Sequence, residues 1–141
     1  MIFFFFANPR IHESVAFRDI LINENLECKI ADFGISNNLG YKELENKNLY
    51  TSLVPPECRE SGEFTKKSDI YFFGWILFEL FIGKKYEDGI EVHDIINILN
   101  QYQKNNNNPK MNQFKLLIIK SLEKVNIKKI YFIYFIFIYF K

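Results

Sequence analysis

The sequence predicts a mainly α-helical domain with one short β-hairpin, and three patterns carry this prediction. Residues 67–82 are apolar on nearly every side, which is typical of a helix in the middle of a core. Residues 92–102 and 114–125 repeat apolar residues at helical spacing, which predicts two amphipathic helices that cover the central one. Closer to the start, two short apolar segments flank Asn-Glu-Asn and predict the hairpin.

The composition limits the class of protein. With 141 residues, of which 48% are hydrophobic, the chain can build one domain with a modest core. The 18 basic and 17 acidic residues give a net charge of +1, so no nucleic-acid partner is expected. Cys28 and Cys58 lie far apart, with no His or Cys nearby at metal-ligand spacing. A reducing, cytoplasmic compartment therefore fits better than a disulfide scaffold or a zinc site.

Both ends of the chain are strongly apolar. Residues 1–7 lack the basic region of a signal peptide, so they are interpreted as an apolar remnant. In the tail at 130–141, eleven apolar residues run from Ile130 to Phe140; as a helix they would span about 17 Å, against about 30 Å for a bilayer core. No transmembrane span is expected, and the aromatic and β-branched composition is typical of an aggregation-prone strand. The domain itself is assigned to residues 8–129.

The hairpin is predicted from alternating apolar and charged residues, and the segment after it is predicted to be a loop because no such pattern is present. The apolar residues Leu26, Cys28 and Ile30 alternate with charged ones, which predicts a strand with one buried face. Asp32-Phe33-Gly34 would then stand at the end of that strand. Residues 35–66 contain Gly and Pro and show no period, so they are expected to form a long, functional loop.

The ends of the helices are predicted from capping residues. Ser68 is the expected N-cap of the central helix, and Gly83 is its expected C-cap. Four asparagines at 105–108, followed by Pro109, predict a loop between the two covering helices.

Four motifs in the expected order resemble the C-terminal lobe of a eukaryotic protein kinase, of the tyrosine kinase or tyrosine-kinase-like type. The stretch "IHESVAFRDILI" is similar to the catalytic loop H-R-D-L-x-x-x-N, and "KIADFGIS" is similar to the magnesium-binding D-F-G segment. "PPE" stands where the family has A-P-E, and "KKSDIYFFGWILFEL" resembles its central helix. The resemblance covers residues 8–129 and implies a C-lobe fold.

The resemblance implies roles for individual residues. Structural roles fall to His12, Phe33 and Asp69, and Lys129 takes the place of an Arg that pairs with the Glu of A-P-E. The activation segment would include Gly34, Tyr41, Tyr50, Thr51, Pro56 and Glu57.

The catalytic position of the resemblance carries no base. Ser14 stands where the family has the Asp that accepts the substrate proton, and a neutral hydroxyl cannot accept a proton near pH 7. General-base catalysis is worth about 10²–10⁴-fold, so no residue here is expected to be catalytically functional. Asp19 replaces the family's Asn, and with Asp32 it could still hold Mg²⁺. Alternatively, Asp32 only shapes its turn, and Asp19 is a solvated loop residue.

Two neighbouring substitutions extend this interpretation. Glu13 occupies the place of the Arg that receives a phosphorylated activation loop, and it would repel that phosphate. Ala16 and Arg18 match the tyrosine-kinase form of the loop. The family's glycine-rich loop, strand Lys and helix Glu have no counterpart before Asn8, so nucleotide affinity is expected to be weak, and one side of Trp75, Phe72 and Leu80 is expected to be open.

Three functions remain open at this point. The favoured one is an inactive, pseudokinase-like fragment that acts through a protein partner, another kinase being one candidate. The alternative is a protein kinase, acting on Tyr or Ser/Thr, that retains weak Mg²⁺ and ATP binding. The third is a truncated gene product without a function.

Overall fold

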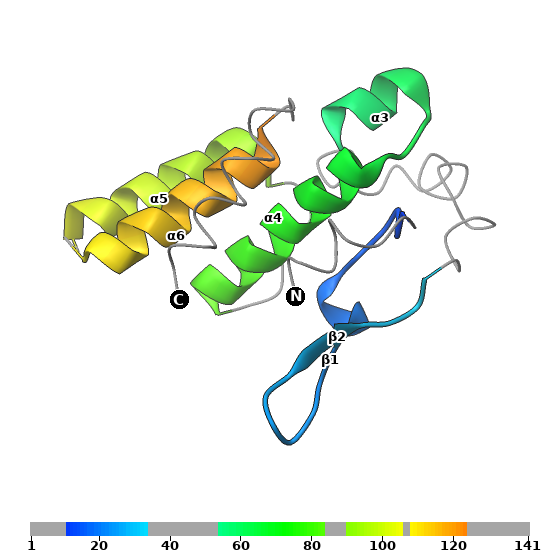
Figure 1. The fold of residues 1–141 in the computed structure, drawn as a ribbon. Coiled ribbons are helices and arrows are strands. Elements are labelled where there is room, and N and C mark those ends of the chain that lie inside the picture. Colours follow the sequence, from blue (N-terminus) through cyan, green and yellow to red (C-terminus); the bar gives the residue numbers. More distant parts are fainter. Residues whose placement is uncertain (1–10, 34–53, 84–89, 106–107, 124–141) are drawn as a thin grey trace.

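The computed structural model describes residues 11–33, 54–83, 90–105 and 108–123 (Figure 1). Within these ranges the elements follow one another as η1 (Phe17–Asp19, a 3-10 turn), β1 (Ile20–Ile22), β2 (Cys28–Ile30), α3 (Pro56–Ser61), α4 (Lys66–Ile82), α5 (Val92–Asn105) and α6 (Pro109–Leu122). The predicted class, mainly helical with one hairpin, is confirmed. None of the helices in the described ranges has the length and hydropathy needed to cross a bilayer.

Helix α4 is the centre of the core. Its buried residues lie on all sides of the helix because other elements surround it, which explains the nearly continuous apolar sequence. Trp75, expected to be open, is only 4% exposed, while Leu80 is indeed exposed and Phe72 is half-buried. The expectation for Trp75 is wrong because its ring packs edge to face against Tyr71 and Phe78, at centroid distances of 6.5 and 6.2 Å.

The ends of α4 are fixed by side-chain and backbone caps. The N-cap is Thr65, not Ser68: the Thr65 hydroxyl accepts from the Lys67 N–H at 3.2 Å. The Ser68 hydroxyl returns the contact by accepting from the Thr65 N–H at 2.8 Å, which makes a capping box. Gly83 is the C-cap, as predicted, with φ of 68° and its N–H donated to the Glu79 carbonyl at 3.0 Å.

Helices α5 and α6 cover α4, as predicted. They bury Ile95 and Leu99 from α5, and Leu117, Ile118 and Leu122 from α6. Gly74 of α4 lies against Ser121 of α6, and Phe81 stacks on Phe114 at 6.2 Å, so α4 and α6 run antiparallel.

The starts and ends of the covering helices differ from the prediction. Helix α6 begins at Pro109, five residues before the predicted start, because a proline is tolerated in the first turn. The Asn108 side chain accepts from the Lys110 N–H at 3.0 Å and caps the helix. Helix α5 continues to Asn105, which shortens the predicted asparagine loop. The predicted contact of Val125 lies outside the described residues.

The hairpin projects from the helical body below α4 (Figure 1). Its antiparallel register pairs Ile20 with Ile30, Leu21 with Lys29 and Ile22 with Cys28. Only the Ile20–Ile30 pair packs against the core; Cys28 is exposed and Leu26 is 82% exposed. The predicted buried face is therefore wrong beyond this first pair, since the outer part of the hairpin has no neighbour in the described chain to cover it.

A short helix interrupts the segment predicted as a loop over 35–66. Helix α3 has Pro56 at its first position and Gly62 as its C-cap. The φ of Gly62, 71°, is left-handed, and its N–H donates to the Cys58 carbonyl at 2.8 Å. The prediction of a continuous loop is wrong for this part because a proline can begin a helix. Residues 34–53 lie outside the described chain.

Candidate functional site

The loop at 11–19 is held by a carboxylate from the first turn of α4. Asp69 is buried, and its two oxygens accept from consecutive peptide groups: Oδ2 from the His12 N–H and Oδ1 from the Glu13 N–H, both at 2.9 Å. Charge-assisted bonds of this kind are about twice as strong as neutral ones. The contacts span 57 and 56 residues of sequence and fix the loop against the central helix.

Burial raises the pKa of Asp69, while the two N–H donors from the loop oppose this rise. The two N–H groups of the loop therefore stabilise the charged form of the buried carboxylate, and the carboxylate in turn holds the loop in position. Asp69 also stands in the first turn of α4, where the helix dipole favours a negative charge.

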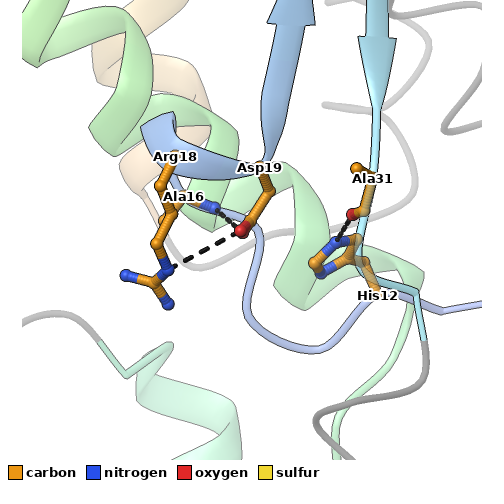
Figure 2. Close-up of polar contacts among 5 residues, drawn as sticks. All are labelled: His12, Ala16, Arg18, Asp19 and Ala31. Carbon is orange, nitrogen blue, oxygen red and sulfur yellow. Dashed lines mark hydrogen bonds and ion pairs between the residues drawn. The ribbon is translucent and has the colours of Figure 1, made fainter.

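His12 joins the loop to the segment after β2. Its ring is buried, and Nε2–H donates to the Ala31 carbonyl at 2.8 Å, as Figure 2 shows. The same ring meets Phe33 edge to face, with centroids 4.7 Å apart. His12, Phe33 and Asp69, the three described residues predicted to be structural, thus lie in one connected cluster.

Asp19 is buried, so the interpretation as a solvated loop residue is wrong. Its Oδ2 accepts from the Ala16 N–H at 2.8 Å and its Oδ1 lies 3.6 Å from Arg18 Nε (Figure 2). The carboxylate closes the turn of η1, which gives a physical reason for its burial.

Asp32 differs from Asp19 in both exposure and backbone. It is exposed, and its φ of 62° lies in the left-handed region. Glu13 is also left-handed, with φ of 73°. Side chains rarely adopt this backbone, which costs about 1–3 kcal/mol per residue, so surrounding contacts must hold it. For Glu13 one such contact is the bond from its N–H to Asp69.

The described residues contain no group of three His, Cys, Asp or Glu side chains that could hold a metal ion. Ser14, at the predicted base position, is half-buried. The predicted pairing of Asp19 with Asp32 around Mg²⁺ stays a prediction.

Helix α3 is tied to α4 by a contact that the sequence analysis did not anticipate. Cys58 Sγ and Ser68 Oγ lie 3.1 Å apart, and both residues are fully buried. Burial raises the pKa of the Cys58 thiol. The signal that could have found this contact is weak, because a buried Cys behaves as a small apolar residue.

Glu57, next to Cys58, has both carboxylate oxygens buried without a hydrogen-bond partner in the described chain. Its predicted partner Lys129 lies outside the described residues, as do Gly34, Tyr41, Tyr50 and Thr51 of the predicted activation segment. Pro56 lies in α3 beside Glu57.

A family described as protein tyrosine and serine/threonine kinase matches residues 3–130. The chain belongs to this kinase family. Its helical body with a two-stranded sheet is consistent with a kinase C-lobe, as predicted.

Individual kinases match parts of the chain. The megakaryocyte-associated tyrosine-protein kinase of Rattus norvegicus is 37% identical over 71 residues, or 50% of this chain and 15% of that protein. The LysM domain receptor-like kinase 3 of Medicago truncatula is 40% identical over 80 residues, or 52% and 12%. The tyrosine-protein kinase transmembrane receptor Ror of Drosophila melanogaster is 32% identical over 102 residues, or 69% and 15%. The chain thus spans less than a fifth of these kinases, which include both tyrosine and receptor-like types.

Proposed function

We propose that this chain is a non-catalytic, pseudokinase-like member of the kinase family that acts by binding another protein. The observation that supports the proposal is the loop at 11–19: its attachment to Asp69 is intact, while Ser14 stands at the position of the base. The scaffold of the loop is thus present without its proton acceptor.

The loop can keep its shape because the attachment uses the backbone. Both donors to Asp69 are peptide N–H groups, so any non-proline residue at positions 12 and 13 could supply them. Glu13 therefore reverses the charge of the family's Arg, and Ser14 removes the proton acceptor, without loss of the contacts that position the loop. Loss of a general base costs about 10²–10⁴-fold in rate.

One observation favours a second candidate, a kinase with residual Mg²⁺ and ATP binding. Asp32 is exposed and its carboxylate is a suitable ligand for Mg²⁺. Asp19 supports this candidate less well, because its carboxylate already accepts from the Ala16 N–H inside η1. The affinity of such a site would be weak.

The partner is proposed to be a protein, and another kinase is one candidate. The net charge of +1 offers no attraction for nucleic acid. A cytoplasmic location is proposed because Cys28 and Cys58 are both free.

A phosphotransfer assay tests the catalytic half of the proposal. The purified chain is incubated with Mg²⁺, labelled ATP and a generic protein substrate, beside the Asp32→Ala variant. We expect no transfer above background from either protein, and no change in melting temperature up to millimolar ATP, because a ligand that binds the native state would stabilise it.

The Ser14→Asp variant is the matched control, because it restores the family's base without touching the contacts of Asp69. Transfer by the unmodified chain that disappears in Asp32→Ala would contradict the proposal. An ATP-dependent rise in melting temperature that Asp32→Ala removes, without transfer, would favour the second candidate.

A further inference from the structure

The charged side chains are distributed unevenly along the chain. Residues 124–141, the basic segment, contain four of the 18 basic residues and none of the 17 acidic ones, which gives a side-chain charge of +4. The other 14 basic residues and all 17 acidic residues give residues 1–123 a charge of −3. Such a difference in charge within one chain is typical of proteins whose basic part contacts nucleic acid or an anionic membrane.

The end of α6 accounts for the last acidic residue of the sequence. Glu123 Oε2 accepts from Lys120 Nζ at 3.2 Å, so the charge of Glu123 is balanced by a lysine of the helix itself. Leu116, one turn before Lys120, is 38% exposed. The last turns of α6 therefore present an apolar and a basic side chain together, and the sequence repeats this combination after Glu123.

Apolar residues follow the lysines of the basic segment directly. Eleven residues from Ile130 to Phe140, seven aromatic and four Ile, lie between Lys129 and Lys141. Nucleic acid has no apolar phase for such a run, whereas the headgroup region of a bilayer accepts aromatic side chains beside lysines. An eleven-residue helix, about 17 Å long, is too short to cross a core of about 30 Å. The composition therefore fits the surface of a bilayer.

We propose that the basic segment binds the surface of a bilayer that contains anionic phospholipids. Its lysines contact the lipid phosphates, and its aromatic side chains enter the interface beside them. The same surface repels the negative charge of residues 1–123, so the basic segment and not the helical body makes the contact. Anionic lipids are typical of the cytoplasmic leaflet, which agrees with the location proposed above. The membrane contact is separate from the proposed protein-binding role and does not depend on the loss of kinase chemistry.

Flotation with vesicles tests the proposal in the full chain. The protein is placed at the bottom of a density gradient with vesicles of phosphatidylcholine, or of phosphatidylcholine and phosphatidylserine. Bound protein rises with the vesicles, whereas self-associated protein stays at the bottom. We expect flotation with the anionic vesicles and much less with the neutral ones. Binding should be weaker at 1 M than at 0.1 M salt, because the Debye length falls from about 10 to about 3 Å.

Charge variants test the role of the lysines. Lys124→Gln, Lys128→Gln and Lys129→Gln together should weaken binding to anionic vesicles about a hundredfold, since each lysine near the surface contributes about fivefold. The matched control makes the same change, Lys→Gln, at three lysines of the described body: Lys29, Lys66 and Lys110. The control removes the same charge away from the basic segment, so binding should change by less than about threefold.

A phenylalanine variant tests the apolar contribution. Phe132→Ser with Phe135→Ser keeps the charge of the chain and should weaken binding about tenfold or more, because less apolar surface enters the interface. Its melting temperature without vesicles should equal that of the unmodified chain. A lower melting temperature with unchanged flotation would mean that these rings pack in the protein's own core, and would overturn the proposal.

Other results would also overturn the proposal. Equal flotation with neutral and anionic vesicles would remove the role of the lysines, as would a control that weakens binding as much as the variant of the basic segment. Protein that stays at the bottom of the gradient with both kinds of vesicle would show self-association or no membrane contact. None of these outcomes alters the phosphotransfer result, so failure of the membrane contact and failure of the proposed function are separable.

Discussion

At the scale of single residues, backbone geometry is set by a few polar contacts. Asp69 fixes two peptide groups of the loop, and Asn23 shapes the hairpin turn, because its Oδ1 accepts from the N–H groups of Asn25 and Glu27 at 3.0 and 2.8 Å. The turn places Leu26 in the left-handed region, with φ of 61°. Residues 24–26 form a three-residue hairpin loop, and in such loops the left-handed last residue is usually Gly.

Replacing Leu26 with Gly should stabilise the protein. The side chain is 82% exposed, so little packing is lost, while the left-handed strain of about 1–2 kcal/mol is removed. The greater freedom of Gly in the unfolded chain offsets part of this gain. We expect the free energy of unfolding in urea to rise by about 0.5–1 kcal/mol. Leu26→Ala keeps Cβ and the strain, so an equal gain in that control would contradict the explanation.

At the scale of elements, α4 and α6 approach closely at a glycine. A Cβ atom placed on Gly74 would lie 2.7 Å from Ser121 Cβ and 3.0 Å from two Leu122 side-chain carbons. These are not the ends of long flexible side chains, so the helices themselves would have to move apart.

Gly74→Ala should therefore destabilise the protein although Ala is the better helix former by about 1 kcal/mol. Overpacking of a core costs roughly 1–3 kcal/mol, and we expect a net loss in the free energy of unfolding within that range. Adding Ser121→Gly to Gly74→Ala removes the nearest clashing atom and should recover part of the loss. Unchanged stability of the single variant would show that the two helices separate without cost.

At the scale of the whole molecule, the two cysteines report how the structure opens. Cys28 is exposed, whereas Cys58 is fully buried between α3 and α4, with a raised pKa. A raised pKa lowers the fraction of reactive thiolate at any given pH. A thiol reagent at pH 8 should modify one thiol rapidly and the second only as fast as the α3–α4 contact opens.

The dependence of the slow phase on urea distinguishes local from global opening. A weak dependence would mean that α3 separates from α4 on its own; a dependence as steep as that of unfolding would mean that Cys58 reacts only in the unfolded chain. Cys28→Ser is the control and should lack the fast phase. Two fast thiols in the native protein would contradict the burial of Cys58.

The helices could be predicted from the sequence because their buried residues either repeat at helical spacing or form a nearly continuous apolar run. From Ile70 onward helix α4 is apolar on nearly every side, and α5 repeats its apolar residues at helical spacing. The buried face of the hairpin could not be predicted in the same way. Alternation at Leu26 and Cys28 shows only that two faces differ, and whether anything covers a face depends on elements distant in sequence.

The residues of the candidate site were predicted from their resemblance to kinase motifs, and not from the periodicity of apolar residues. Asp69 and His12 were assigned structural roles by resemblance to kinases, and the structure supplies contacts for both. Two contacts were not anticipated: that of Asp19 with the Ala16 N–H and that of Cys58 with Ser68. The sequence does not distinguish the short polar side chains of Asp19 and Ser68 from solvated ones. The prediction of Ser68 as N-cap was wrong because Thr65, three positions earlier, is also a favourable cap residue.

The separation of 57 residues between His12 and its acceptor Asp69 has a consequence for biosynthesis. A ribosome adds roughly 5–20 residues per second, so the loop is made about 3–11 s before the carboxylate that will fix it. During this interval Ile20 and Ile30, which pack against the core in the folded chain, have no central helix beside them. This nascent segment is therefore a stretch where chaperone binding during translation would have most effect.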